Sequence, residues 1–194
     1  MKNNLYIIAG CNGAGKTTAS YTILPEIIQC KEFVNADEIA KGLSPFQPET
    51  VSIEAGRIML SRINELLKEG KSFAFETTLS TKTYKNKILE AQKNNYKVTL
   101  LFFGLQNIEL AKARVKTRVL EGGHNVANET IARRYINGIK NLLEIYLPIV
   151  DQFMIFDNSD GKHELIVEKL EYADLNVIND DKLKKLEYYN SNHE

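Results

Sequence analysis

A glycine-rich run near the N-terminus carries residue types that bind phosphate groups. It reads Gly10-Cys11-Asn12-Gly13-Ala14-Gly15-Lys16-Thr17 and matches the pattern G-x-x-x-x-G-K-[ST] in full. Glycines let backbone N–H groups turn toward phosphates, the lysine can reach the β- and γ-phosphates, and the threonine hydroxyl can ligate Mg²⁺. The run, called the P-loop below, therefore predicts a site for ATP or GTP with Mg²⁺. The predicted nucleotide-binding residues, with Thr17 as metal ligand, are Gly10, Asn12, Gly13, Ala14, Gly15, Lys16, Thr17 and Thr18.

Asp37 follows a short predicted strand at residues 33–35. A carboxylate at such a position could accept the proton of a substrate hydroxyl, or hold Mg²⁺ through water. The structural alternative is that Asp37 is the N-cap of a helix beginning near Glu38. Both can hold at once, and beside a P-loop we favour the chemical role.

Glu76 closes a second apolar run at residues 72–75. A glutamate directly after a buried strand loses hydration unless it meets a partner, and the neighbouring hydroxyls of Thr77 and Thr78 suit a polar ligand. The alternative is that Glu76 begins a solvent loop and the threonines cap the next helix. We favour substrate contacts for Glu76 and Thr78.

Four arginines lie in two pairs on consecutive predicted helices, Arg114 with Arg118 and Arg133 with Arg134. A transferring phosphoryl group needs positive charge, which arginines on a closing lid supply. At about 100° per residue, Arg118 lies nearer than Arg114 to the apolar stripe of its helix, and Arg134 nearer than Arg133. We therefore select Arg118 and Arg134. A solvated face with helix ion pairs, such as Arg118 with Glu121, is equally compatible with the pattern.

Arg57 stands on another predicted helix, where it could contact substrate or extend from a core helix with its charge in water. Both interpretations remain open. The substrate-binding candidates are Asp37, Arg57, Glu76 and Thr78. The catalytic candidates are Lys16, Asp37, Arg118 and Arg134.

Alternating strands and helices must position these residues. Strands are expected at residues 5–9, 33–35, 72–75, 98–103 and 153–157, and helices at 16–24, 50–69, 82–94, 107–120 and 129–146. This order predicts an α/β fold of the P-loop NTPase or kinase type, with three layers, a five-stranded mostly parallel sheet and a helical lid at about 107–146. The carboxyl ends of such strands meet at one edge, which would gather Gly10, Asp37 and Glu76.

Length and composition predict one domain over residues 1–194, with a C-terminal extension from about 158 that holds a strand pair near 165–178 and a short helix. Acidic and basic residues number 25 each, so neither nucleic acid nor a membrane surface is an expected partner. No apolar run approaches the length of a membrane span. A disulfide at Cys11 would obstruct the P-loop, so a reduced, cytoplasmic setting is expected.

In an ordered set of motifs, the sequence resembles the zeta toxin family of P-loop kinases. The set spans roughly residues 5–146, and its members are Gly13-Ala14-Gly15-Lys16-Thr17-Thr18, Asn35-Ala36-Asp37, Phe75-Glu76-Thr77-Thr78-Leu79-Ser80, and the segment from Arg114-Val115 through Gly122-Gly123-His124 to Arg133-Arg134-Tyr135. The resemblance implies a sheet like that of nucleoside monophosphate kinases. It also implies ATP- or GTP-dependent phosphorylation of a hydroxyl of UDP-N-acetylglucosamine, and an antitoxin as a possible partner.

The resemblance also implies roles for single residues. Lys16 would be the phosphate lysine and Asp37 the general base. Glu76 and Thr78 would contact substrate, and Arg118 and Arg134 would neutralise the transferring phosphate. The sequence departs from the larger toxins at Ser80, where they usually carry an arginine.

Two other hypotheses fit the P-loop. One is a kinase of another metabolite, a nucleoside or a nucleic-acid end. The other is a nucleotide-dependent switch or regulatory ATPase without an acceptor. A switch would need neither Asp37 beside the acid and threonines at 76–78 nor paired lid arginines, and the sequence supplies both. These features favour a kinase with an acceptor.

Overall fold

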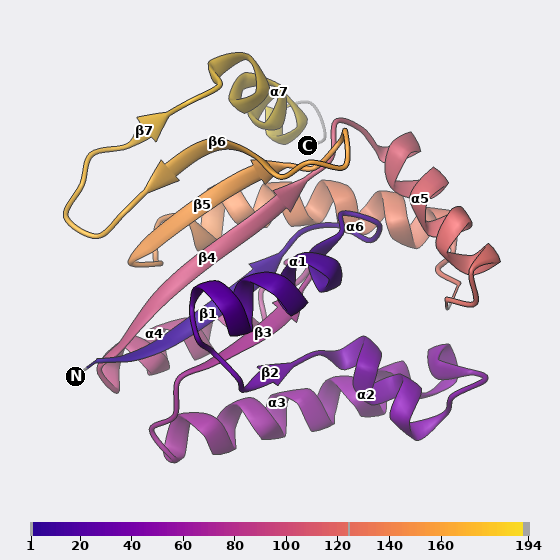
Figure 1. Cartoon of the computed structure of the whole chain (residues 1–194), viewed down its shortest axis with the longest axis horizontal. Helices are drawn as coiled ribbons and strands as arrows, with labels where there is room; N and C mark the ends of the chain where they lie inside the picture. The colour runs from indigo at the N-terminus through magenta and orange to yellow at the C-terminus, as the bar shows by residue number, and fades with distance from the viewer. Residues whose placement is uncertain (1, 124, 192–194) are drawn as a thin grey trace.

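A computed structural model describes residues 2–123 and 125–191 of the chain. His124, which contributes to the Gly-Gly-His part of the family resemblance, lies outside the described residues. The backbone forms one central sheet with helices on both of its faces (Figure 1). In that view α1 lies in front of the sheet, and α4 and α6 lie behind it.

Among the described residues, seven strands make up the sheet, in the order β2-β3-β1-β4-β5-β6-β7. The first five are parallel, and the last two are antiparallel to their neighbours. Their bounds are Asn3–Ala9 for β1, Phe33–Val34 for β2, Phe73–Thr77 for β3, Tyr96–Gly104 for β4, Gln152–Asp157 for β5, Glu164–Lys169 for β6 and Asn176–Val177 for β7. The mostly parallel α/β fold is confirmed, but the predicted number of five strands is wrong. The strand pair expected in the C-terminal extension enlarges the same sheet, because β6 hydrogen-bonds to β5 and β7 to β6.

The helices alternate with the strands as predicted. Their bounds are Lys16–Thr22 for α1, Ala36–Leu43 for α2, Ser52–Lys68 for α3, Tyr84–Lys93 for α4, Ile108–Leu120 for α5, Asn128–Asn141 for α6 and Asp180–Ser191 for α7. Single π-helical turns at Ile23–Ile27 and Leu142–Tyr146 extend α1 and α6, and a 3₁₀ turn at Pro48–Val51 precedes α3.

The core lies on both faces of the parallel strands. Parallel strands covered by helices on both sides have continuous apolar runs rather than alternating ones, and this explains the sequence signal at residues 98–103. Fully buried side chains with 0% exposure include Leu5, Ile7, Ile8, Phe73, Phe75, Leu100 and Phe103.

Helix α6 is held closely to the segment that follows β3. The Asn141 side chain donates to the carbonyl oxygen of Leu79 at 2.7 Å, and the Tyr146 hydroxyl donates to that of Thr81 at 2.6 Å. Gly138 brings the two backbones together, since a Cβ there would lie 2.7 Å from the carbonyl oxygen of Thr78. The segment after β3 is therefore fixed by a predicted lid helix.

Helix α7 packs against both α6 and the end of β5. The rings of Tyr189 and Tyr135 meet edge to face with centroids 5.2 Å apart, and Lys182 forms an ion pair with Asp157 at 2.5 Å. The Tyr135 hydroxyl donates to the carbonyl oxygen of Leu105 at 2.7 Å. Burial raises the pKa of Tyr135, so this hydroxyl remains a donor. The C-terminal extension therefore supports α6 from the side of α7.

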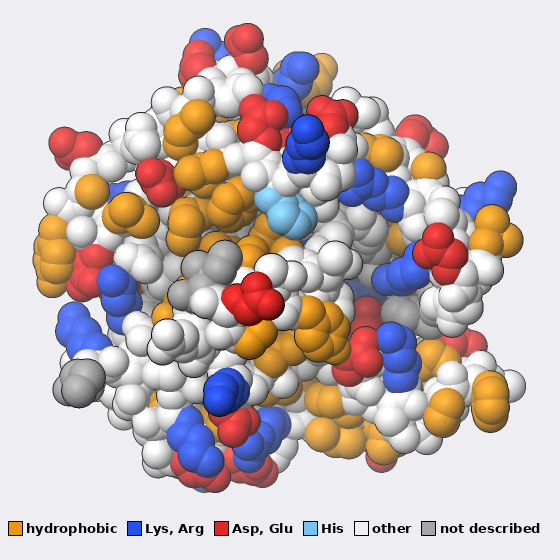
Figure 2. All heavy atoms as spheres, in the orientation of Figure 1, with side chains coloured by type: hydrophobic (Ala, Val, Ile, Leu, Met, Phe, Trp, Pro, Cys, Tyr) orange, Lys and Arg blue, Asp and Glu red, His pale blue; other side chains and the backbone are white. Residues whose placement is uncertain are grey.

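Figure 2 shows Lys and Arg side chains interspersed with Asp and Glu over the face in view. This mixture agrees with the equal numbers of acidic and basic residues. Within residues 2–123 and 125–191, every helix is too short or too polar to cross a membrane.

Gly138→Ala should destabilise the protein even though alanine is the better helix former. The clash with Thr78 costs about 1–3 kcal/mol, against the roughly 1 kcal/mol that alanine gains over glycine inside a helix. Gly56→Ala in α3 is the matched control, because no atom lies within 4 Å of its Cβ position. It should stabilise by about 0.5–1 kcal/mol. Urea unfolding of both variants measures the difference, and a stabilised Gly138→Ala would contradict the close packing of α6.

Candidate active site

The P-loop connects β1 to α1, as its sequence predicts. Gly13 and Gly15 have φ values of 81° and 79°, in the left-handed region that side chains rarely adopt. A Cβ at Gly10 would lie 2.2 Å from the carbonyl oxygen of Phe103, and one at Gly15 would lie 2.5 Å from the side-chain nitrogen of Asn158. The glycines of the motif are therefore required by the backbone path and by close neighbours.

Lys16 of the P-loop forms an ion pair with Glu76 of β3. The ammonium of Lys16 lies 3.5 Å from Oε1 of Glu76, and their side chains are only 7% and 8% exposed. The Thr17 hydroxyl donates to the other carboxylate oxygen at 2.9 Å, and the Lys16 ammonium also donates to the carbonyl oxygen of Cys11 at 3.0 Å. Glu76 thus faces the P-loop lysine and threonine rather than a solvent loop.

The strand register brings these residues together. Ile8 of β1 pairs with Glu76 of β3, so the carboxylate lies beside the start of the P-loop. On the other side, Val34 of β2 pairs with Phe75, which places Asn35 next to Glu76. The predicted gathering of three strand ends at one sheet edge is found.

Asn35 is a site residue that sequence reasoning missed. Its side-chain oxygen accepts from the backbone N–H groups of Asp37 at 2.8 Å and Glu38 at 3.4 Å, so Asn35 is the N-cap of α2. Its side-chain nitrogen donates to Glu76 at 2.9 Å. The alternative that Asp37 caps this helix is therefore wrong. Asparagine is a preferred N-cap residue, and this preference could have identified the cap two residues earlier.

Two cavities meet at Asp37. The P-loop cavity, of about 200 Å³, is lined by Asn12, Gly13, Gly15, Lys16, Thr17, Thr18, Asp37, Glu76, Arg114 and Arg118. The α2 cavity, of about 320 Å³, is lined by Ala36, Asp37, Ala40, Pro48, Glu49, Ser52, Asn125, Val126, Ala127, Thr130 and Arg134. Asp37 is the residue common to both linings.

Arginines reach these cavities from α5 and α6. Arg114 and Arg118 both line the P-loop cavity, because residues four apart share one face of a helix. The cavity lining therefore does not separate Arg114 from Arg118, and the choice of Arg118 stays a prediction. On α6 the phasing holds, since Arg133 is exposed whereas Arg134 donates to the side-chain oxygen of Asn12 at 3.2 Å. Burial lowers the pKa of Arg134, and the nearby Asp37 carboxylate opposes this shift.

Thr78 and Arg57 are not among the residues that line the two cavities. The Thr78 hydroxyl forms a 2.9 Å hydrogen bond with the Ser80 hydroxyl. Arg57 is exposed on α3. The structure therefore brings together Lys16, Glu76 and the base candidate, but not the whole set of predicted substrate contacts.

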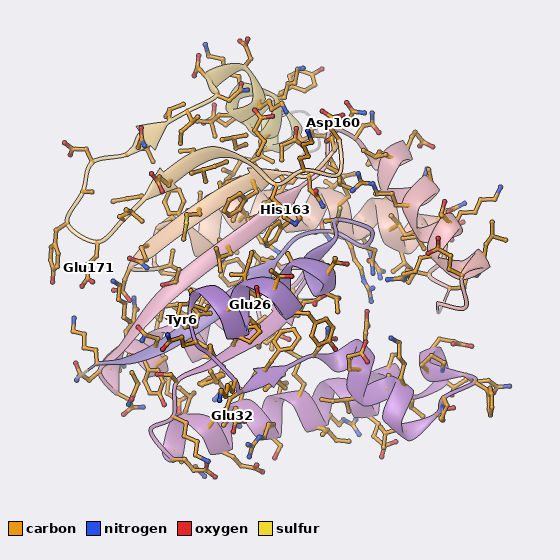
Figure 3. The ribbon with its side chains drawn as sticks, viewed as in Figure 1. Tyr6, Glu26, Glu32, Asp160, His163 and Glu171 are labelled. Atoms are coloured by element: carbon orange, nitrogen blue, oxygen red, sulfur yellow. The ribbon has the colours of Figure 1, made fainter. Side chains whose placement is uncertain are left out.

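The segment after β5 also contacts the P-loop. The Asn158 side chain, 5% exposed, donates to the carbonyl oxygen of Ala14 at 2.8 Å. Arg114 donates to the carbonyl oxygen of Ser159 at 2.8 Å, and Figure 3 labels Asp160 in the same segment. The P-loop itself has no reactive thiol, since burial raises the pKa of Cys11 to about 11.

The donors around the P-loop fit a magnesium nucleotide. Among the described residues no group of three His, Cys, Asp or Glu side chains could hold a metal ion by itself. Mg²⁺ in kinases is held by few protein groups together with substrate phosphates. The Thr17 hydroxyl and the Glu76 carboxylate, which lie 2.9 Å apart, are the groups that would take part.

The sheet order and the P-loop after β1 define a protein of the P-loop kinase class. A model of the zeta toxin family matches residues 2–171, and the chain belongs to that family. The resemblance carried by the sequence motifs is thereby confirmed. A protein of Haemophilus influenzae is 30% identical over 135 residues, which cover 70% of this chain and 94% of that protein.

Solved structures show the same fold. A chain of the AvrRxo1-ORF1:ORF2 complex with ATP superposes with a TM-score of 0.75 at 18% identity, covering 95% of this chain. The present chain spans only 63% of the length of that one. A chain of the PezAT toxin–antitoxin system of Streptococcus pneumoniae gives a TM-score of 0.65 at 17% identity, covering 97% of this chain and 86% of the other.

Lys16→Ala should abolish nucleotide binding and turnover without unfolding the protein. The lysine is buried rather than solvent-facing, but Glu76 retains hydrogen bonds from Thr17 and Asn35 when the ammonium is removed. Titration calorimetry with Mg·ATP, together with a circular dichroism spectrum, measures both effects. Lys87→Ala, which breaks an ion pair on α4, is the control and should bind as the wild type does. Normal nucleotide turnover in folded Lys16→Ala would contradict the assigned site.

Proposed function

We propose that this chain is an ATP- or GTP-dependent kinase that transfers the γ-phosphate to a sugar hydroxyl, with UDP-N-acetylglucosamine as the acceptor. The position of Asp37 between the P-loop cavity and the α2 cavity carries the proposal. A general base must reach both the acceptor hydroxyl and the site where the γ-phosphate lies. Membership of the zeta toxin family supports the same reaction.

In this mechanism Asp37 accepts the proton of the acceptor hydroxyl as the hydroxyl oxygen attacks the γ-phosphorus. The bond from that phosphorus to the nucleotide's bridging oxygen breaks, and the nucleoside diphosphate leaves. Lys16 and Thr17 leave Glu76 and turn toward the phosphates and the metal. Mg²⁺, when bound, supplies charge neutralisation at the phosphate oxygens.

Arginine charge completes the phosphate site. Arg118 lines the P-loop cavity from α5, and Arg134 lines the α2 cavity from α6, so the two approach the transferring group from different sides. Charge that develops on the phosphoryl oxygens in the transition state is stabilised by such groups. Arg114 also lines the P-loop cavity, where it lies with Lys16 and Arg118.

The α2 cavity supports a polar acceptor. Its volume of about 320 Å³ lies within the range of small-molecule sites, and Glu49, Ser52 and Thr130 offer hydrogen-bonding groups for hydroxyls. Among its described lining residues, Arg134 is the one cation, and Arg57 lies outside the lining. This charge balance favours, as a second candidate, a kinase of a different hydroxyl acceptor that lacks a diphosphate.

We further propose a cytoplasmic location and a protein partner of the antitoxin kind. Both cysteines are free and buried, which suits a reducing compartment. The PezAT system is described as a toxin–antitoxin pair, and the AvrRxo1 structure is a complex of two gene products. Co-purification with the product of an adjacent gene tests the partner.

Arg134→Ala should reduce kcat on the order of 10³-fold while changing nucleotide affinity little, because the charge acts mainly in the transition state. Arg118→Ala is expected to behave in the same way. Arg133→Ala is the control, since its side chain is exposed on the other face of α6, and it should change kcat by less than about twofold. Steady-state kinetics on the three variants measures this, and equal losses for Arg133 and Arg134 would rule out the assignment.

The acceptor is tested by mass spectrometry of a reaction containing the protein, Mg²⁺, ATP or GTP, and UDP-N-acetylglucosamine. We expect a product heavier by one phosphate. Asp37→Asn should bind Mg·ATP normally but lose about 10²–10⁴-fold in transfer, because asparagine cannot accept the proton.

Two outcomes would change the proposal. Consumption of ATP without a phosphorylated UDP-sugar at millimolar acceptor would exclude that acceptor, and a metabolite library would then be screened for a phosphorylated product. Loss of Mg·ATP binding in Asp37→Asn would identify Asp37 as a metal residue rather than the base.

A further inference from the structure

Asn35 connects the two halves of the site through one buried amide. Its side chain is 6% exposed, and both of its ends are used. The oxygen caps α2 at the backbone N–H of Asp37, at 2.8 Å, and the nitrogen donates to Oε2 of Glu76, at 2.9 Å. A single planar group therefore ties the helix that carries the proposed base to the carboxylate that contacts the P-loop.

Glu76 has three side-chain partners in this structure: Lys16, Thr17 and Asn35. In the proposed reaction the first two must turn toward phosphate and metal. Asn35 then remains the one of these three partners that holds the carboxylate. A movement of Glu76 on nucleotide binding would act on this amide, whose other end is bonded to the first turn of α2.

We propose that Asn35 is a positioning residue that couples occupation of the P-loop to the placement of Asp37 toward the acceptor. The inference rests on the proposed kinase reaction and deepens it. In this arrangement the Glu76 carboxylate links the P-loop to Asn35 and does not contact the acceptor. A base displaced by about 1 Å can lose 10²-fold in rate, so a single hydrogen bond at this point has a large effect on transfer.

A purely structural role for Asn35 would be helix capping, and substitution can separate the two roles. Serine and aspartate are both good N-cap residues, so Asn35→Ser and Asn35→Asp keep the cap of α2. Both remove the N–H donor to Glu76. Aspartate also places a second negative charge beside that carboxylate, which is unfavourable. If capping were the whole role, Asn35→Ser, which adds no charge, would behave as the wild type does.

Asn179 provides a matched control on α7. Its side-chain oxygen accepts from the backbone N–H of Lys182 at 3.1 Å, and its nitrogen donates to Glu164 at 2.9 Å. The bonding pattern resembles that at Asn35, but Asn179 is only partly buried and lies outside both cavities. Asn179→Asp should therefore leave nucleotide binding and transfer unchanged.

The first test is amide hydrogen exchange with a non-hydrolysable ATP analogue and Mg²⁺. In the wild type, the analogue should slow exchange both in the P-loop peptide and in the peptide covering residues 35–43. In Asn35→Ser, the P-loop protection should remain and the response of residues 35–43 should disappear. An unchanged response of residues 35–43 would overturn the coupling, and this readout does not require an acceptor.

The second test is kinetic. Asn35→Asp should lower kcat for transfer about 10–100-fold, with the dissociation constant for Mg·ATP changed by less than about threefold. The double variant Asn35→Asp with Glu76→Gln exchanges the acid and the amide, and so restores a hydrogen bond between the two positions. It should recover at least part of the transfer rate that Asn35→Asp loses.

The outcomes separate the two proposals. If the wild type yields no phosphorylated product from any acceptor, the proposed function fails and the exchange experiment alone decides the role of Asn35. If product forms and Asn35→Asp transfers phosphate at the wild-type rate, the positioning role is excluded and the kinase proposal stands.

Discussion

Two opposite charges, on Lys16 and Glu76, are enclosed at the carboxyl ends of adjacent strands, and much of the surrounding structure depends on this pair. Removing ions from water costs several kcal/mol each, and their attraction offsets that cost only with good geometry and further hydrogen bonds. The hydroxyl of Thr17 and the amide of Asn35 supply those bonds. The pair is thus stable in the free protein, while the lysine and the threonine remain free to exchange one set of oxygen partners for another.

The sheet order explains how so many polar groups meet without a long loop. With β3 between β1 and β2, the P-loop, Glu76 and Asn35 leave three adjacent strands at one level. Helix α6 then contacts both sides of this edge, through Arg134 on the P-loop and through Asn141 on the segment after β3. Movement of this helix therefore acts on the phosphate site and on the segment after β3 together.

Sequence reasoning succeeded where the signal was local. The P-loop motif and the apolar runs of the parallel strands depend on residues close together in the chain, and the structure contains both. It failed where pairing between distant segments decides the result. The attachment of β6 to β5 enlarged the sheet. The register of β1 against β3 placed Glu76 beside the P-loop, and the register of β2 against β3 made Asn35 part of the site. The roles of Asp37 and of the arginines remain predictions.

The contact between Tyr189 and Tyr135 has a consequence for how this family can diversify. Helix α7 begins at Asp180, beyond residues 2–171, which the family model matches, yet it supports the helix that carries Arg134. Substitutions in α7 can therefore alter the packing that supports that helix while every residue of the phosphate site stays the same. The support of α6 and the residues of the phosphate site thus lie in separate stretches of the chain, and natural selection can change one without replacing the other.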